Sequence, residues 1–508
     1  MFDFELPEKY RRYVPLVIWV LVAFVVLAIP LKIIGLGYLP YDDALRHAAK
    51  AVSGKPWPEI LVVGDSFKLD HNLGWHALLG AVHHATGWNA ENLVLFSVVV
   101  LFLVVNGALL PWLKRPEAWL IMLLVAVIIS DLPERFMFGR PFLLTIAVLM
   151  TILSATQKLK PGWPALVLFT ALITACTFVH GVWYLWLLPV AAFFFAGQFR
   201  WMFLVAAAWL AGAGLAALLT GHPMVYLSQA ITMALSSTGQ HATNRTEVTE
   251  LQPFDGNILA VMVVGVLVLL RAVTKSTAAP LTKSPAFWLV CGCWILAFRV
   301  GRFWEDWGWP ALMVLAATEL DFFMDAKIAA DSWRRLVLAV SLALATFLAV
   351  TSDLGSRWTR SLTWSFLTPD APELAGWLPD KGGIFYCADM NLFYQTFFKN
   401  PNADWKYILG YEPSLMPADD FKTYQKILWN LGDAKAYKPW LLKMKLADRL
   451  IIPGGRGNVP NIPQLEWNYG ASGIWLGRLP NHRQGGAPVT IPATEPLALL
   501  TNAPASTK

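Results

Sequence analysis

The acidic pair Asp42–Asp43 is the first group in the chain whose residue types could do chemistry. It lies in the segment Leu39–Lys50, directly after a proline and a tyrosine, and carboxylates there favour the first turn of a helix. Apolar residues then recur on one helical face, so the simplest interpretation is a capped amphipathic helix that lies flat on a membrane. The alternative is functional, because a carboxylate held there could deprotonate an acceptor hydroxyl or bind a divalent metal such as Mg²⁺ or Mn²⁺.

Histidines gather in the same part of the chain. Five of the nine fall within residues 35–92, namely His47, His71, His76, His83 and His84. They form no HExxH pattern, so a zinc protease is not indicated. His76 and His83 are seven residues apart and share a helical face, where packing explains them more simply than metal binding.

Other charged residues mark the ends of apolar segments. They are Asp131, Glu134, Arg135, Arg140, Arg299, Arg302, Glu305 and Asp306, together with His180. A charge at a membrane boundary is costly unless it reaches water, pairs or serves a site. Reaching water explains any one of them, but not their gathering on one side of the membrane. Arginines at this depth would suit a lipid-linked phosphate or diphosphate, which guanidinium groups bind bidentately.

The elements that must position these side chains are membrane helices. Of the 508 residues, 56% are hydrophobic and only 15% are charged, whereas a soluble domain has about a quarter charged residues. The 25 Trp suit the bilayer interface. Basic cytoplasmic loops account for the net charge of +6, so nucleic acid is not an expected partner. Most of the four Cys lie in apolar segments, which excludes a disulfide framework.

About eleven segments have the apolar character of membrane spans, each of which needs about 20 residues. They are 13–34, 93–112, 118–131, 141–155, 163–179, 183–198, 202–220, 257–270, 285–299, 309–324 and 336–351. The first is too long for the core of a cleavable signal, so we expect a retained anchor. One set of connections holds fourteen Lys and Arg in roughly 55 positions, against nine in roughly 120 for the other, which predicts a cytoplasmic N-terminus.

The predicted fold is an α-helical polytopic membrane protein with a small α/β domain at its C-terminal end. The transmembrane domain covers residues 1–351 and includes two long outer loops, 35–92 and 221–256. Residues 352–480 alternate short apolar runs, at 384–387, 450–452 and 474–476, with helical stretches near 419–430 and 438–446, which is typical of a small α/β unit. With an odd number of spans after a cytoplasmic N-terminus, this unit is expected on the outer side of the membrane, in the periplasm or outside the cell. The tail 481–508 is rich in Pro, Ala, Thr and Gly and is expected to be disordered.

These features resemble the GT-C superfamily of membrane glycosyltransferases, which includes protein O-mannosyltransferases and the aminoarabinose transferase of lipid A. The segment Tyr41–Ala48 looks like the acidic pair and juxtamembrane helix of that family, and Leu69–His76 is similar to a later part of the same loop. Phe138–Pro141 and His180–Trp183 look like its Arg-Pro and His-Gly-x-Trp elements. The second acidic motif of the family, two acids one residue apart, is matched at best by Asp131 and Glu134, which are the candidate metal ligands.

The resemblance implies a glycosyltransferase on the outer face of the bacterial cytoplasmic membrane. It would take a sugar from a polyprenyl-phosphate donor held among membrane lipid and pass it to a glycan, lipid or protein acceptor. Asp42 or Asp43 would be the general base or a metal ligand, with Asp42 favoured as the position nearer the membrane. The implied substrate-binding residues, with the arginines at the leaving phosphate, are Arg46, His71, Arg140, His180, Arg299 and Arg302.

Three other functions stay open. A transporter or flippase would have a cavity that opens alternately to both sides, although the sequence contains no internal repeat of the kind typical of that class. A membrane acyltransferase would use His180 as its base, deep in a tunnel that reaches the cytoplasm. A non-enzymatic subunit of an envelope assembly complex would not depend on Asp42 or Asp43. An outward cavity centred on the acidic pair would favour the transferase over the acyltransferase.

Overall fold

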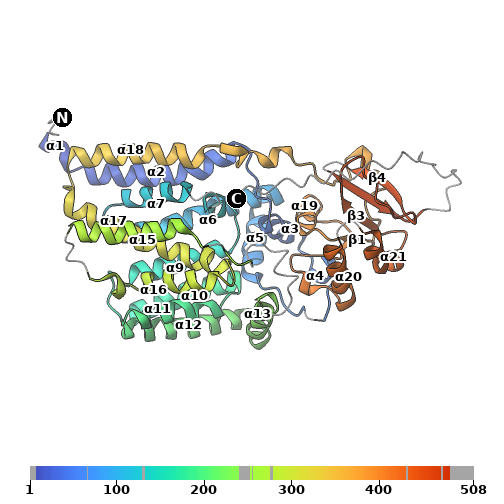
Figure 1. Cartoon of the computed structure of the whole chain (residues 1–508), viewed down its shortest axis with the longest axis horizontal. Helices are drawn as coiled ribbons and strands as arrows, with labels where there is room; N and C mark the ends of the chain where they lie inside the picture. The colour runs from blue at the N-terminus through green and yellow to red at the C-terminus, as the bar shows by residue number, and fades with distance from the viewer. Residues whose placement is uncertain are drawn as a thin grey trace.

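The computed structural model describes residues 7–65, 67–128, 132–238, 252–254, 256–274, 279–430, 433–470 and 473–480. Within these residues, a bundle of long helices adjoins a smaller domain that contains a five-stranded sheet (Figure 1). The predicted disordered tail, 481–508, and the predicted metal ligand Asp131 lie outside the described residues.

The bundle is built from apolar helices whose outer surfaces stay apolar. Its members are α2 (Val14–Gly35), α6 (Ala90–Leu109), α7 (Glu117–Ile128), α9 (Phe142–Ala155), α10 (Trp163–His180), α11 (Leu187–Phe195), α12 (Phe199–Leu219), α15 (Ile258–Thr274), α16 (Pro285–Ala297), α17 (Trp309–Lys327) and α18 (Trp333–Thr351). Leu16, Val20 and Phe24 of α2 are all more than half exposed. A row of large apolar side chains facing outward suits lipid and would be unfavourable in water.

Five helices of the described chain are long and apolar enough to cross a membrane, by length and composition. These are Glu8–Gly35, Ala90–Trp112, Trp163–His180, Phe199–Leu219 and Trp333–Thr351. Helices α7, α9, α11, α15 and α16 are apolar but shorter. Each predicted span overlaps one of the bundle helices, with boundaries that differ by a few residues. This arrangement is compatible with a multi-pass helical membrane protein, and the number of spans stays a prediction.

A buried ion pair fastens α7 to α18 near the end of the bundle that holds the N-terminus (Figure 1). Glu117 is fully buried and accepts hydrogen bonds from Nε and Nη2 of Arg335, at 2.5 and 3.0 Å. The third guanidinium nitrogen donates to the carbonyl of Ala330 at 2.8 Å. The carboxylate therefore compensates the charge that Arg335 carries into the protein.

The predicted loop 35–92 is mostly helical. It contains α3 (Asp43–Ser53), α4 (Trp57–Ile60) and α5 (Leu73–Thr86). The helix after the acidic pair is confirmed, and Asp42 caps it by accepting a hydrogen bond from the amide of Ala44 at 3.4 Å. Its position differs from the prediction of a helix lying flat on the membrane. Almost every residue from Ala44 to Ala51 is buried, because α3 packs against α5, α6 and α19 of the C-terminal domain.

The second predicted loop, 221–256, begins as a helix. Helix α13 runs over Pro223–Thr238 and packs against α12. Residues 239–251 lie outside the described chain. Helix α13 therefore extends the bundle on the side where Figure 1 places α5 and the C-terminal domain.

The C-terminal domain has a mixed sheet with helices packed on it. Its strands are β1 (Ile384–Cys387), β2 (Lys406–Tyr407), β3 (Arg449–Pro453), β4 (Glu466–Gly470) and β5 (Ile474–Arg478), and its helices are α19 (Met390–Lys399), α20 (Ala418–Trp429) and α21 (Lys438–Lys443). The strand order is β2-β1-β3-β5-β4, with β1 parallel to β2 and β3 and the remaining pairs antiparallel. The sequence predicted strands β1, β3 and β5 and helices α20 and α21, but not α19.

The segment after α3 joins the C-terminal domain to the bundle. Leu61 forms a parallel bridge with Tyr407 of β2, and the amide of Val62 donates to the Tyr407 carbonyl at 2.9 Å. The ring of Trp57 lies 4.9 Å from that of Tyr411, centroid to centroid. The domain is thus attached to the segment that carries the acidic pair, and it covers that end of the bundle.

Candidate active site

A cavity of about 540 Å³ lies where the bundle meets the C-terminal domain. Its volume is in the range of small-molecule sites, roughly 300–1,000 Å³. Its wall includes six of the residues predicted for catalysis or binding, namely Asp43, Arg46, His71, Arg140, His180 and Arg302. Asp42 and Arg299 are not among the described residues that line it. These six side chains come from positions up to 259 residues apart in the sequence, from Asp43 to Arg302.

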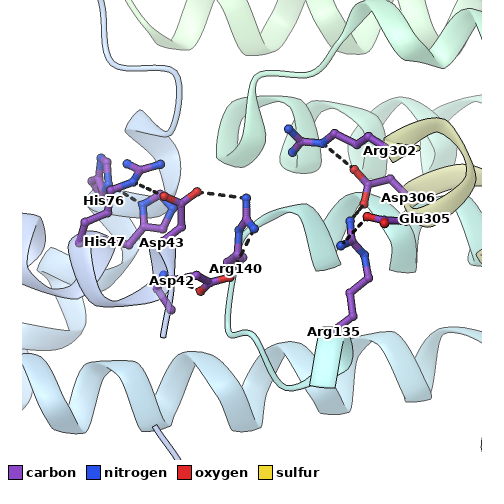
Figure 2. A network of polar contacts seen from close by, with 11 residues as sticks. Asp42, Asp43, His47, His76, Arg135, Arg140, Arg302, Glu305 and Asp306 are labelled. Carbon is purple, nitrogen blue, oxygen red and sulfur yellow. Dashed lines mark hydrogen bonds and ion pairs between the residues drawn. The ribbon is translucent and has the colours of Figure 1, made fainter. Parts of the chain in front are cut away.

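Asp43 is held by two guanidinium groups (Figure 2). Its Oδ1 accepts from Nε of Arg46 at 2.7 Å, and its Oδ2 lies 3.1 Å from Nη2 of Arg140. The other terminal nitrogen of Arg140 donates to Oδ2 of Asp42 at 3.3 Å. Gly139 adopts a φ of +65° and passes close to Val98 of α6, which places Arg140 at the start of α9.

These ion pairs set the protonation of the acidic residue in the wall. Burial acts to raise the pKa of Asp43, but Arg46 and Arg140 outweigh it and hold the pKa well below its usual range. Asp43 is therefore ionised at any physiological pH. A carboxylate paired with two guanidinium groups is a weak base, because protonation would weaken both ion pairs.

Arg46 presents a polar atom that the described chain leaves unsatisfied. Its side chain is 4% exposed, and its guanidinium lies 4.1 Å from the ring centroid of Tyr411. Its Nη1 and the hydroxyl of Tyr411 are both buried and have no hydrogen-bond partner among the described residues. Because buried polar groups are normally hydrogen-bonded, an anionic or hydroxyl-bearing ligand in this cavity would satisfy them.

The geometry favours Asp43 over Asp42 as the acidic residue that contacts a substrate. The sequence favoured Asp42 as the base. The structure instead uses Asp42 to cap α3 and to pair with Arg140, and Asp42 is not among the described residues that line the cavity. Asp43 lies in the wall itself. Of the pair, Asp43 is thus the one placed to meet a substrate, and Asp42 helps to position Arg140.

A second ion-pair cluster lies on the other side of Arg140 in Figure 2. Arg135 pairs with Asp306 and with Glu305, the latter at 2.9 Å. Nε of Arg302 donates to Oδ2 of Asp306 at 2.9 Å. Both acids lie on one π-helical turn, Trp304–Gly308. Arg302 lies two residues before this turn and lines the cavity, so positive charge reaches the wall from the start of α9, from α3 and from the segment before the turn.

Two histidines complete the predicted wall. His180 ends α10, where its Nδ1 lies 3.1 Å from the hydroxyl of Thr145. Gly181 follows with a φ of +70°, and a Cβ there would lie 2.9 Å from the carbonyl of His71. Burial lowers the pKa of His71 to about 4, so its ring is neutral near pH 7. These rings offer hydrogen bonds of the kind that sugar hydroxyls need.

The wall also contains residues that sequence reasoning missed. His47 lines the cavity, and its ring continues through His76 to Asp70 by hydrogen bonds of 2.8 and 2.5 Å. His76, which the sequence interpreted as a packing residue, is buried, and it also forms hydrogen bonds at both ring nitrogens. The sequence pattern that could have revealed this pair is Asp70, three residues before the start of α5, followed by His76 in the first turn of that helix. Tyr411 and Glu412 enter from the C-terminal domain without any local signal.

The described residues of the wall do not fit a divalent metal. Asp42 and Asp43 share Arg140, whose positive charge occupies the place that a cation would take. Glu134, the described member of the predicted metal pair, is not among the residues found in the wall. Within the described chain, no group of three or more His, Cys, Asp or Glu side chains could hold a metal. The chemistry below therefore uses no metal.

Comparison with known proteins leaves the family open. No protein-family model matches the chain, and no curated protein matches its sequence. The functional argument therefore depends on the cavity and its side chains.

Proposed function

We propose that this protein is a glycosyltransferase of the bacterial cytoplasmic membrane. It has about eleven spans, a cytoplasmic N-terminus and a C-terminal domain on the outer face, where it moves a sugar from a polyprenyl-phosphate donor to a glycan, lipid or protein acceptor. The observation that carries this proposal is the gathering of Arg46, Arg140 and Arg302 with Asp43 around one cavity.

The arginines account for the phosphate of the donor. A guanidinium matches phosphate oxygens in pairs, and Arg46 has a buried nitrogen with no partner among the described residues. As the sugar leaves, the bond between its anomeric carbon and the phosphate oxygen breaks, and the electron pair stays on that oxygen. Fixed positive charge in a cavity shielded from water stabilises the anion that forms.

One side of the cavity is apolar and could hold the lipid tail of the donor. Ala230, Ile231, Ala234 and Leu235 of α13 line it, and Ile231 and Leu235 are also exposed on the surface of the bundle. This side offers an isoprenoid chain a path from the cavity to the bilayer. The sugar would then lie toward His71 and His180, and the acceptor would enter beneath Tyr411 and Glu412.

The location of the cavity also favours the transferase over the acyltransferase. His180 lies in the same wall as Asp43, at the junction with the C-terminal domain. An acyltransferase that used His180 with a cytoplasmic acyl donor would need a tunnel along the bundle. The wall residues instead come from the junction end of the bundle, which supports chemistry on the side of the C-terminal domain.

A transfer assay tests the proposal. The full chain is reconstituted in proteoliposomes with a panel of polyprenyl-phosphate sugars and an envelope lipid and glycan extract, and released polyprenyl phosphate is measured by mass spectrometry. We expect release from at least one donor, with a matching mass gain in one acceptor. Absence of polyprenyl phosphate release from every donor would refute the proposal.

A further inference from the structure

A buried chain of hydrogen bonds links Asp70, His76 and His47 to the cavity. Oδ2 of Asp70 lies 2.5 Å from Nδ1 of His76, and Nε2 of His76 lies 2.8 Å from Nδ1 of His47. His76 is 7% exposed and His47 is 1% exposed. The amide of Asn72 donates to the other oxygen of Asp70 at 3.0 Å, which fixes the carboxylate. His47 is the member of this chain that lines the cavity with Asp43 and Arg140.

The order of the bonds fixes the tautomer of each ring. An ionised carboxylate only accepts, so Nδ1 of His76 carries its proton and Nε2 of His76 carries a lone pair. That lone pair accepts the Nδ1 proton of His47. Nε2 of neutral His47 is therefore unprotonated, as a general base requires. Burial acts to raise the pKa of Asp70, but His76 outweighs it and keeps that carboxyl ionised.

The charges around His47 keep it neutral before reaction. Burial lowers the pKa of His47, and Arg46, His76 and Arg140 lower it further, whereas Asp43 opposes them. Asp43 itself is bonded to two guanidinium groups and is a weak proton acceptor. Of the two groups, His47 thus has the available lone pair.

We propose that His47 takes the proton of the acceptor hydroxyl, and that His76 and Asp70 are positioning residues for it. This assignment rests on the proposed transferase function. The acceptor oxygen forms a bond to the anomeric carbon as the bond from that carbon to the phosphate oxygen breaks. The hydroxyl proton moves to Nε2 of His47, and the electron pair of the O–H bond stays on the acceptor oxygen, which becomes the glycosidic oxygen. The electron pair of the broken bond stays on the phosphate oxygen. Asp70 makes the ring of His76 more basic, so the hydrogen bond from His47 to His76 stabilises the imidazolium that forms on His47.

The alternative is that the chain only fastens α3 to α5. If the role is purely structural, the variants should lose stability and donor binding. The pH dependence of kcat should then be unchanged, because no group of this chain titrates in the chemical step. The variants must therefore be compared in turnover, in its pH profile and in donor binding.

The test uses the full chain in proteoliposomes, with polyprenyl-phosphate sugar as donor and polyprenyl phosphate as the binding probe. We expect His47→Gln to lower kcat about 100- to 10,000-fold while it binds polyprenyl phosphate within about twofold of the unmodified protein. The acidic limb of the kcat–pH profile disappears in this variant. Exogenous imidazole partly restores turnover in His47→Ala. Asp70→Asn lowers kcat with the probe still bound, and His84→Gln, on the exposed end of α5, changes neither quantity.

Different failures refute different claims. Turnover of His47→Gln within threefold of the unmodified protein would overturn the assignment, as would loss of the acidic limb in Asp43→Asn but not in His47→Gln. Loss of probe binding by His47→Gln without imidazole rescue of His47→Ala would also overturn it, in favour of a structural role. An unmodified protein that releases polyprenyl phosphate from no donor would overturn the transferase itself and the assignment with it.

Discussion

Replacing Arg140 by glutamine tests how the wall is charged. The change removes one guanidinium that reaches Asp43 at 3.1 Å and Asp42 at 3.3 Å. Each such charge-assisted contact contributes about 1.5–3 kcal/mol, but Asp43 keeps Arg46 and Asp42 keeps the amide of Ala44. The net loss of stability is therefore about 2 kcal/mol, and the melting temperature should fall by about 2–5 °C.

The effect on transfer should be much larger than the effect on stability. If Arg140 meets the leaving phosphate, its loss removes about 3–4 kcal/mol of transition-state stabilisation, or about a 100- to 1,000-fold fall in kcat/KM. Arg140→Lys keeps the charge but not the fork that spans both carboxylates, so we expect an intermediate fall of about tenfold. Release of polyprenyl phosphate from proteoliposomes measures both.

A matched control separates the loss of this arginine from the loss of any buried arginine. Arg115→Gln removes a similarly paired guanidinium, which contacts Asp325 and the carbonyl of Ile328 away from the cavity. We expect its turnover per folded molecule to equal that of the unmodified protein. Arg140→Gln with kcat/KM within threefold of the unmodified protein would refute the role of this arginine at the phosphate.

Three further changes test the fold and the wall. Glu117→Gln leaves the charge of Arg335 buried without a carboxylate, so unfolding in detergent should become about 3–5 kcal/mol easier, and Glu117→Met with Arg335→Met should recover most of this loss. Because burial lowers the pKa of His71 to about 4, the unfolded chain takes up a proton below the ordinary value of 6.5 that the native state does not. Stability should therefore rise with pH between these values by up to about 1.4 kcal/mol per pH unit, and His71→Asn should flatten the pH dependence of the melting temperature. Gly181→Ala forces a side chain into a φ of +70° and within 2.9 Å of the His71 carbonyl, so both the melting temperature and kcat should fall, and unchanged values would contradict the described turn.

The sequence predicts those parts of the site that depend on local chemistry. A carboxylate at a helix start predicted α3, and the cost of a charge at a membrane boundary singled out Arg140, His180 and Arg302. It favoured Asp42, whereas Asp43 lies in the cavity wall, because adjacent side chains at a helix start point in different directions. That choice depends on where α3 packs.

The remaining features come from contacts between distant segments. Helix α19 is only ten residues long, and its paired aromatic residues, Phe393-Tyr394 and Phe397-Phe398, favour a strand by propensity. It forms a helix because these side chains pack against α3 and the sheet, which lie far from it in the sequence. The bond from His47 to His76 joins residues 29 apart. Tyr411 reaches Arg46 only because the C-terminal domain adds its edge to the segment after α3.

A cryo-electron microscopy structure of the full chain bound to polyprenyl phosphate would test the proposed active site directly. We predict the phosphate inside the cavity, hydrogen-bonded to Nη1 of Arg46 and to Arg140 or Arg302, with the isoprenoid chain leaving along Ile231 and Leu235 of α13. A phosphate bound outside the cavity, or near the buried pair at the opposite end of the bundle, would contradict a donor site built around Asp43.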